Sequence, residues 1–215
     1  MSVCYIIAAG DCNKISIDKK ADDFIIAADG GIDYCIRDNI VPDVIIGDFD
    51  SAEAVPDNDN VIRLPVEKDD TDTFYAVKFA MSRGFSKFAI FGGAGGKRPD
   101  HTFANIALLA FIADNNCEGF MYYNDYTVTA IKNSRISFSE NAKGDISVFS
   151  FNEKAYGVSE CGLKYTIDDF VLTNSVPLGV SNSFVGKKSF VEVRDGILLI
   201  YFSGNFSLCT IDKLN

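Results

Sequence analysis

The first 132 residues alternate short apolar segments with longer amphipathic ones, and this alternation most strongly limits the folds open to the chain. The apolar segments are nearly continuous, which is typical of strands covered on both faces in a parallel sheet. They occupy residues 3–10, 24–31, 44–50, 61–65 and 87–93. Strands that alternate with helices predict an open α/β sheet for this part of the chain.

Two of the intervening segments have helical spacing. Residues 71–84 carry apolar side chains at positions 74, 77, 80 and 81 and end at Gly84, a common helix terminator. Residues 100–116 begin at Asp100, which is suited to cap a helix. In this second helix we expect one apolar face, made of Phe103, Ile106, Ala107 and Ala110.

The pattern changes near residue 133. Beyond it, short and often alternating segments are separated by turns that contain glycine, and no helical pattern is present. The segments are residues 135–140, 145–152, 189–196 and 197–202. The sequence therefore predicts a mostly parallel α/β domain over residues 1–132, followed by an antiparallel β domain, a sandwich or a barrel, over residues 133–215.

The chain of 215 residues is acidic, with 20 Lys and Arg against 30 Asp and Glu and a net charge of −10. This balance argues against nucleic-acid binding, which normally needs a basic surface. No apolar run approaches the roughly 20 residues that span a bilayer, and the N-terminus lacks the basic start of a signal peptide. We expect a soluble, cytoplasmic protein that binds neither nucleic acid nor membrane.

Cysteine and histidine usage excludes several kinds of site. The six cysteines are scattered without a Cys-x-x-Cys pair, so neither a disulfide framework nor a zinc ribbon is expected. Most of them should be small buried residues. His101 is the single histidine, and a helix-capping or packing role is the first expectation for it.

Four acidic or glycine-rich motifs follow predicted strands. They are Asp-Gly-Gly at 29–31, Gly-Asp-Phe-Asp-Ser at 47–51, Lys-Asp-Asp-Thr-Asp at 68–72 and the glycine-rich segment 92–100. Singly, each motif is an ordinary turn or a helix start. In an open α/β sheet, however, ligands bind at the carboxyl ends of the strands. Gathering these carboxylates at one edge favours a hard cation such as Mg²⁺, together with a phosphate substrate. The acidic carboxylates are Asp29, Asp48, Asp50, Asp69, Asp70, Asp72 and Asp100.

The glycine-rich segment fits a phosphate site, with Lys97 and Arg98 adding positive charge to its backbone N–H groups. It is not a Walker A loop, because Phe91 and Arg98 stand where that motif needs Gly and Ser or Thr. A flexible glycine turn is the alternative interpretation.

In this order and spacing, the motifs resemble the thiamine pyrophosphokinase family. The segments that carry the resemblance are 29–31, 42–51, 68–72 and 92–106, with Gly-Leu-Lys-Tyr at 162–165 and Val-Ser-Asn-Ser at 180–183 in the second half. The resemblance implies an α/β domain followed by a β-sandwich, and a homodimer with active sites at the subunit interface. It also implies Mg²⁺-dependent transfer of the diphosphoryl group of ATP to the hydroxyethyl group of thiamine, giving thiamine diphosphate and AMP.

The same resemblance assigns roles to individual residues. Mg²⁺ would be held by Asp48, Asp50 and Asp72, and Asp69 would support the metal and the phosphates. The catalytic residues would be Asp69, Asp72, Arg98 and Asp100. ATP would contact Asp29, Gly30, Gly31, Gly95, Gly96, Lys97 and Arg98. Thiamine would contact Tyr165, Ser181 and Asn182. Other members carry Trp at the Tyr165 position, and this chain has no Trp. Lys97 and Pro99 depart from the family's glycine loop. Either Asp72 or Asp100 is a candidate to take the proton from the thiamine hydroxyl.

Two other functions fit part of the pattern. The Asp48-Phe49-Asp50 sequence after a strand is similar to the Asp-x-Asp motif of Mg²⁺-dependent phosphatases that form an aspartyl phosphate. That interpretation leaves the glycine loop and the β domain without a role. A non-catalytic sensor of nucleotide or thiamine would need few metal-directed carboxylates.

Overall fold

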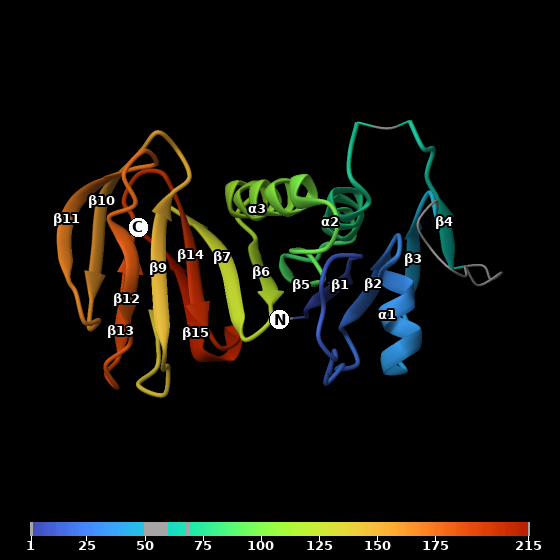
Figure 1. The fold of residues 1–215 in the computed structure, drawn as a ribbon, viewed down its shortest axis with the longest axis horizontal. Coiled ribbons are helices and arrows are strands. Elements are labelled where there is room, and N and C mark those ends of the chain that lie inside the picture. The colour runs from blue at the N-terminus through green and yellow to red at the C-terminus, as the bar shows by residue number, and fades with distance from the viewer. Residues whose placement is uncertain (1, 50–59, 68, 215) are drawn as a thin grey trace. The chain divides into compact units, whose positions relative to one another are not determined.

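The computed structural model describes residues 2–49, 60–67 and 69–214 (Figure 1). The chain divides into two compact units. The first unit contains Met1–Leu108 with Met121–Asn124, and the second contains Leu109–Phe120 with Asp125–Asn215. The predicted domain boundary at residues 132–133 stays a prediction, and the two compact units are described separately below.

The first unit contains a parallel sheet, as the near-continuous apolar segments predicted. Its strands lie in the order β5, β1, β2, β3 and β4, and every neighbouring pair is parallel. Their bounds are Cys4–Ile7 for β1, Phe24–Ala28 for β2, Val44–Gly47 for β3, Val61–Arg63 for β4 and Lys87–Phe91 for β5. Each of the five predicted apolar segments therefore contains a strand.

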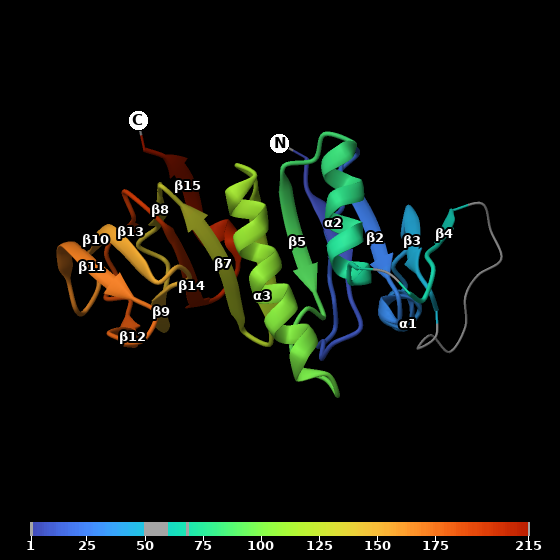
Figure 2. The same cartoon turned by 90° about the horizontal axis from the view of Figure 1, so that it is seen from above.

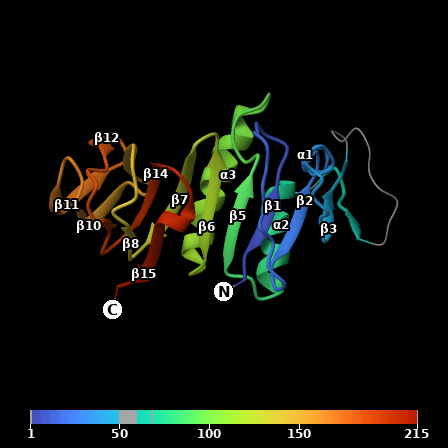
Figure 3. The same ribbon diagram turned by 90° about the horizontal axis from the view of Figure 1, so that it is seen from below.

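Helices α1 (Gly31–Asp38) and α2 (Asp72–Ser82) lie on opposite faces of this sheet (Figures 2 and 3). Side chains alternate between the two faces of a strand. On one face Ile7, Ile25 and Ile45 pack against Ile32 and Cys35 of α1. Helix α2 was expected from its apolar spacing, but the sequence analysis did not anticipate α1.

Helix α3 (Pro99–Asp114) corrects two expectations. Asp100 is not the N-cap, because the helix begins at Pro99, a residue well suited to the first helical position, and Asp100 lies within the first turn. The predicted apolar face is also wrong, since Phe103 is 74% exposed and Ala107 is exposed. The buried positions are Asn105, Leu108, Leu109, Ala110, Ile112 and Ala113. The helix is apolar nearly all round, so a buried bond from Asn105 Nδ2 to Gly93 O, 2.7 Å long, is a better guide to its orientation.

The second unit contains two antiparallel sheets. In one, the order is β7 (Tyr126–Lys132), β14 (Ile197–Ser203), β9 (Asp145–Ser150) and β12 (Gly179–Ser183). In the other, the order is β11 (Ile167–Thr173), β10 (Lys154–Cys161), β13 (Ser189–Glu192), β8 (Ser134–Phe138) and β15 (Cys209–Lys213). Strand β6 (Glu118–Tyr123) is divided between the two units. The only helix after residue 133 in the described part of the chain is the 3-10 turn Phe206–Leu208.

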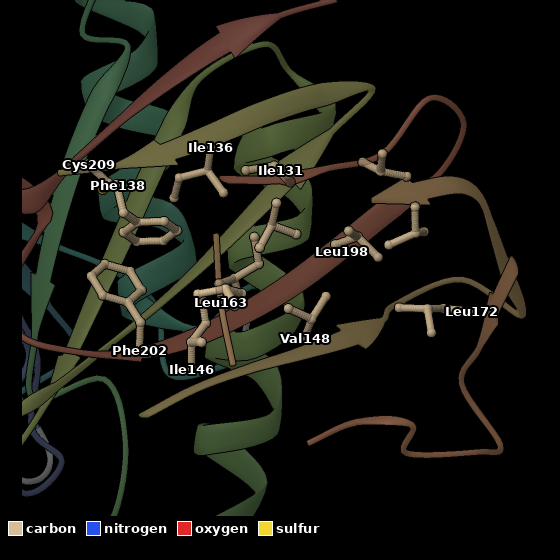
Figure 4. Close-up of a cluster of buried hydrophobic side chains, with 14 of the residues drawn as sticks. Ile131, Ile136, Phe138, Ile146, Val148, Leu163, Leu172, Leu198, Phe202 and Cys209 are labelled. Carbon is tan, nitrogen blue, oxygen red and sulfur yellow. The ribbon is translucent and has the colours of Figure 1, made fainter. Parts of the chain in front are cut away.

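The two sheets of the second unit enclose one apolar core, so this unit is a sandwich (Figure 4). Ile146 and Phe202 come from one sheet, whereas Ile136 and Phe138 come from the other. The rings of Phe138 and Phe202 meet edge to face with centroids 5.1 Å apart. The predicted fold class, an α/β domain followed by an antiparallel β-sandwich, is confirmed.

All six cysteines are free, as expected. Burial is less general than expected, because only Cys4, Cys35 and Cys209 are buried and Cys161 is exposed. Across the described ranges, no helix has the length and apolar character needed to cross a bilayer.

Candidate functional site

A cavity of about 580 Å³ opens at the carboxyl ends of the parallel strands in the first unit. Its wall combines the chain that follows β1, β2 and β5 with the start of α2. Of the residues predicted to act together, Asp29, Gly30, Asp72, Gly95, Gly96, Lys97 and Arg98 line this cavity. Three of the four strand-end motifs, those at 29–31, 68–72 and 92–100, therefore contribute residues to one cavity, as expected for an open α/β sheet.

The Asp-Gly-Gly turn places Asp29 at the cavity wall. Asp29 has a φ of 48°, and its N–H donates to Ile46 O at 2.8 Å, which ties this turn to β3. Gly31 lies directly on β1, since a Cβ built there would be 1.9 Å from Ile7 O. Gly31 therefore lets α1 start against the sheet, and its place is structural, because it does not line the cavity.

The next strand end carries Asp48. Gly47 brings β3 close to Asp29, because a Cβ at this glycine would be 2.9 Å from Asp29 Cα. Phe49 has a φ of 63°, a left-handed conformation that strains a residue with a Cβ. Asp48 is half-buried but does not line the cavity. Asp50, the other predicted metal ligand of this motif, lies outside the described residues.

The Lys-Asp-Asp-Thr-Asp motif begins α2. The Thr71 hydroxyl accepts a hydrogen bond from Phe74 N–H at 3.2 Å, so Thr71 caps the helix. Asp72 follows in the first turn, lines the cavity and has its Oδ1 atom buried. Asp70 pairs with Lys78, and Asp69 is exposed away from the cavity lining. Lys68 lies outside the described residues.

The glycine-rich segment is braced by the chain that follows β1. Gly10 N–H donates to Gly92 O at 2.7 Å, and Asp11 N–H donates to Ala94 O at 2.8 Å. The two segments are in such close contact that a Cβ on Gly92 would lie 2.2 Å from Ala8 O. This bracing contradicts the interpretation of the segment as a flexible turn.

Gly95 and Gly96 both adopt positive φ, 74° and 76°, which favours glycine. The Gly95 N–H donates to Thr102 Oγ1 at 3.0 Å. This donor is therefore already used, and a Cβ on Gly95 would lie 2.4 Å from Asp11 Oδ2, so the glycine lets the segment pack against the Asp11 side chain.

Arg98 and Asp100 form an exposed ion pair with an N···O distance of 2.6 Å. The hydrogen bond from the Arg98 guanidinium lowers the pKa of Asp100 from 3.8 to about 2. Asp100 is thus a carboxylate at neutral pH and a weak base. Arg98 lines the cavity but Asp100 does not. His101, expected to cap or pack, is instead exposed at the cavity wall.

Several cavity residues were missed by the sequence analysis. Gly10 and Asp11 follow β1 as the other motifs follow their strands, so the same strand-end signal could have found them. Tyr34 and Asp33 come from α1, which was not anticipated. Tyr34 Oη donates to Gly10 O at 2.7 Å, and burial raises the pKa of this phenol, which keeps it protonated. Asn105 completes the set, and no sequence signal distinguished it from its apolar neighbours.

The described residues do not by themselves complete a metal cage. Within residues 2–49, 60–67 and 69–214, no three His, Cys, Asp or Glu side chains are grouped so that they could hold a metal ion. Four carboxylates line the cavity, those of Asp11, Asp29, Asp33 and Asp72, and Asp29 and Asp72 each have a buried Oδ1 atom. Carboxylate oxygens are ligands that Mg²⁺ prefers. The chemistry of the donors therefore fits Mg²⁺, and the predicted set of Asp48, Asp50 and Asp72 stays a prediction.

The residues expected to contact thiamine come together in the second unit. Tyr165, in the turn between β10 and β11, is 59% exposed, and Lys164 Nζ lies 5.2 Å from the centre of its ring. Asn182 on β12 is only 4% exposed and hydrogen-bonds the backbone of Tyr165. Ser181 is exposed, with a φ of 62°. An exposed aromatic ring is a suitable surface for a flat heteroaromatic ligand.

Comparison with known families gives two matches along the chain. Residues 18–121 match a family model described as the catalytic domain of thiamin pyrophosphokinase. Residues 133–198 match a model described as the vitamin B1 binding domain of thiamin pyrophosphokinase.

Individual relatives agree over nearly the whole length. The chain is 25% identical over 210 residues to thiamine pyrophosphokinase of Bacillus subtilis (strain 168), covering 93% of this chain and 98% of that protein. A crystal structure of thiamine pyrophosphokinase from Bacillus subtilis superposes with a TM-score of 0.81 at 22% identity, covering 95% of this chain and 100% of that one. Thiamin pyrophosphokinase from Candida albicans gives a TM-score of 0.72 at 18% identity, covering 94% and 88%. These structural likenesses show that the fold is shared.

Proposed function

The chain belongs to the thiamin pyrophosphokinase family, and we propose that it transfers the diphosphoryl group of ATP to the hydroxyethyl group of thiamine. The observation that carries this proposal is the cavity of the first unit, which is lined by Asp29 and Asp72 as well as by Lys97 and Arg98. Carboxylates that suit a divalent cation and cationic side chains that suit phosphate are both needed to bind a metal–nucleotide complex.

The chemistry forms one bond and breaks another. The hydroxyl oxygen of thiamine bonds to the β-phosphorus of ATP, while the bond from that phosphorus to the oxygen bridging the α-phosphate breaks. AMP leaves with the bridging oxygen, and the hydroxyl proton is released. Such transfers depend mainly on positioning and on neutralising the phosphate charge.

The glycine-rich segment supplies positive charge for the phosphates. Lys97 and Arg98 line the cavity and place two cations there. Gly95 also lines the cavity, and it lets the segment pack closely on Asp11, whose Oδ2 atom would lie 2.4 Å from a Cβ at this glycine. The bracing of this segment on the chain after β1 keeps these groups in place before ATP binds, which lowers the free energy spent on ordering them.

Magnesium belongs to the same proposal, with Asp48, Asp50 and Asp72 holding the ion and Asp69 supporting it. When bound, Mg²⁺ supplies charge neutralisation for the phosphates of ATP. Asp72 is the best placed of these residues, because it begins α2 at the cavity wall with one oxygen buried.

Of the two candidates to take the hydroxyl proton, the geometry favours Asp72. Asp100 is paired with Arg98, and its pKa of about 2 makes it a weak proton acceptor. We assign to Asp100 the positioning of Arg98 instead.

A matched pair of variants tests the proposal. Asp72→Asn keeps the shape of the side chain but removes its charge, and Asp114→Asn does the same at an exposed ion pair with Lys132 in the second unit. With ATP, Mg²⁺ and thiamine, we expect kcat to fall on the order of 100-fold or more in Asp72→Asn and to change little in Asp114→Asn. Thiamine diphosphate and AMP are quantified by chromatography.

Three results would contradict the proposal: full activity in Asp72→Asn, full activity without any divalent cation, or phosphate release from simple phosphoesters without thiamine. The last result would favour the phosphatase. Binding of ATP and thiamine without turnover would favour a sensor.

Assembly and location are part of the proposal: a cytoplasmic homodimer with active sites at the subunit interface. Mixing Asp72→Asn subunits with Tyr165→Ala subunits tests the shared site, because one site of each hybrid dimer would receive only intact groups. Random mixing should restore about a quarter of the wild-type activity. No gain on mixing, or a monomer by light scattering, would contradict the shared site.

A further inference from the structure

The chain that leads into Tyr165 from β10 is fixed by the sandwich of the second unit. Gly162, with a φ of 74°, lies against the chain before β13, where a Cβ would be 2.3 Å from Lys188 O. Leu163 is 5% exposed and pairs with Phe184 across an antiparallel bridge. Lys164 N–H then donates to Ser183 O at 3.0 Å. The backbone therefore reaches Tyr165 along a defined path beside the end of β12.

Asn182 holds Tyr165 by both of its backbone polar groups. The Asn182 Oδ1 atom accepts from Tyr165 N–H at 2.9 Å and from Ser183 N–H at 2.9 Å. Its Nδ2 group donates to Tyr165 O at 2.8 Å and to Glu160 Oε2 at 2.8 Å. A primary amide has two donors and two acceptor positions, so these four bonds use its whole capacity.

Glu160 fixes the orientation of that amide. It lies on β10 in the five-stranded sheet, is 3% exposed, and reaches Asn182 on β12 in the other sheet. Because a carboxylate accepts hydrogen bonds, it selects the Nδ2 side of the amide and turns Oδ1 towards the Tyr165 N–H. Burial raises the pKa of Glu160, whereas the Asn182 hydrogen bond lowers it.

We infer that Glu160 and Asn182 form a positioning pair that holds Tyr165 ready for thiamine, and that Asn182 itself makes no contact with thiamine. This inference rests on the proposed function for the identity of the ligand. The rest of it follows from the bonds described above, since a 4% exposed amide with four hydrogen bonds has no group left for a ligand. Tyr165, with its ring 59% exposed, remains the contact residue.

Replacing Tyr165 by Trp gives a direct reporter, because the chain contains no other Trp. In the full-length Tyr165→Trp protein without ligand, time-resolved fluorescence anisotropy measures how ordered the introduced indole is. The change in its fluorescence when thiamine is added gives the Kd for thiamine. Asn182→Ala is made in this background. Asn152→Ala is the matched control, since Asn152 Oδ1 accepts from Ile197 N–H at 2.8 Å at the opposite end of β10.

Two further variants keep the test decisive if Asn182→Ala folds poorly. The double variant Glu160→Leu, Asn182→Ala removes the pair without leaving a buried charge unpaired. Glu160→Gln is the conservative variant, since its side-chain oxygen can still accept from Asn182 Nδ2. Circular dichroism verifies that each protein is folded.

Without the pair, we expect faster local motion of the introduced indole and a thiamine Kd raised roughly 3- to 10-fold. The Kd rises because binding must then order a side chain that the pair would otherwise hold in place. Both changes should occur in Asn182→Ala and in the double variant. Glu160→Gln should recover most of the affinity, and the KM for ATP should stay within about twofold in every variant. Asn152→Ala should match its parent.

The inference is overturned if thiamine Kd rises while the motion of the introduced indole stays the same, because Asn182 would then contact the ligand directly. It is also overturned if the motion increases and Kd does not change. A Tyr165→Trp protein that binds no thiamine would instead contradict the proposed function, while the anisotropy comparison would still decide whether the pair orders this position of the turn.

Discussion

Substituting Gly92 by Ala tests whether the contact between the glycine-rich segment and the chain after β1 holds the proposed ATP site. Gly92 has a φ of 64°, and a Cβ there would lie 2.2 Å from Ala8 O. Gly84 is the matched control, because its φ is 88° but a Cβ there meets nothing within 4 Å. Both substitutions place a Cβ on left-handed backbone, and only Gly92→Ala adds the steric overlap.

The expected magnitudes follow from these two contributions. Left-handed backbone costs about 1–2 kcal/mol for a residue with a Cβ, which is the expected loss of stability for Gly84→Ala. Overpacking against fixed backbone adds about 1–3 kcal/mol, so we expect about 2–5 kcal/mol for Gly92→Ala. The overlap is with backbone, so the strands or the loop must move, which should break the hydrogen bond from Gly10 N–H to Gly92 O.

The assay combines stability with kinetics. Chemical or thermal unfolding compares the two variants, hydrogen exchange follows the Gly10 and Asp11 amides, and steady-state kinetics gives kcat/KM for ATP. Because small displacements of positioned groups lower rates strongly, we expect kcat/KM for ATP to fall roughly 10- to 100-fold in Gly92→Ala and to be retained in Gly84→Ala. Equal destabilisation of the two variants, or unchanged exchange and kinetics in Gly92→Ala, would refute the reasoning.

Three further outcomes follow from the described contacts. NMR should give Asp100 a pKa of about 2 in the folded protein, and this pKa should return towards 3.8 in Arg98→Ala. Because folding lowers this pKa, the stabilisation from the ion pair is present above pH 3.8 and is lost as the pH falls through about 2. Tyr34→Phe should lower stability by about 0.5–1.5 kcal/mol through loss of the bond to Gly10 O, and an unchanged unfolding midpoint would count against this bond. Phe202→Ala should cost about 3–5 kcal/mol, because Phe202 is fully buried in the sandwich; a change below about 1 kcal/mol in denaturant unfolding would show that the core is not packed as described.

The strand-end motifs could be found from the sequence because local composition reports them. Near-continuous apolar runs marked the parallel strands, and Asp29 and Asp72 could be assigned to one site by the rule that ligands bind where such strands end. The same rule could have pointed to Gly10, but the sequence could not show that Gly10 hydrogen-bonds the glycine-rich segment. Its partner Gly92 is far away in the sequence, and the two meet only because β1 and β5 are neighbours in the sheet.

The orientation of α3 shows a second limit. Its sequence is apolar on nearly every side, so periodicity could not select the buried face. A single polar residue, Asn105, is buried there by its bond to Gly93 O. Likewise, the sequence marked Asn182 as part of a motif, but only the structure shows that Tyr165, Glu160 and Ser183 together use its whole amide.

The most direct test of the account is the identity of both products formed by the wild-type protein. The protein is incubated with ATP, Mg²⁺ and thiamine, and the mixture is followed by phosphorus NMR and chromatography. Thiamine diphosphate and AMP should accumulate in equal amounts, and neither should form when thiamine is left out. ADP with thiamine monophosphate, or inorganic phosphate without a thiamine product, would contradict the proposed function.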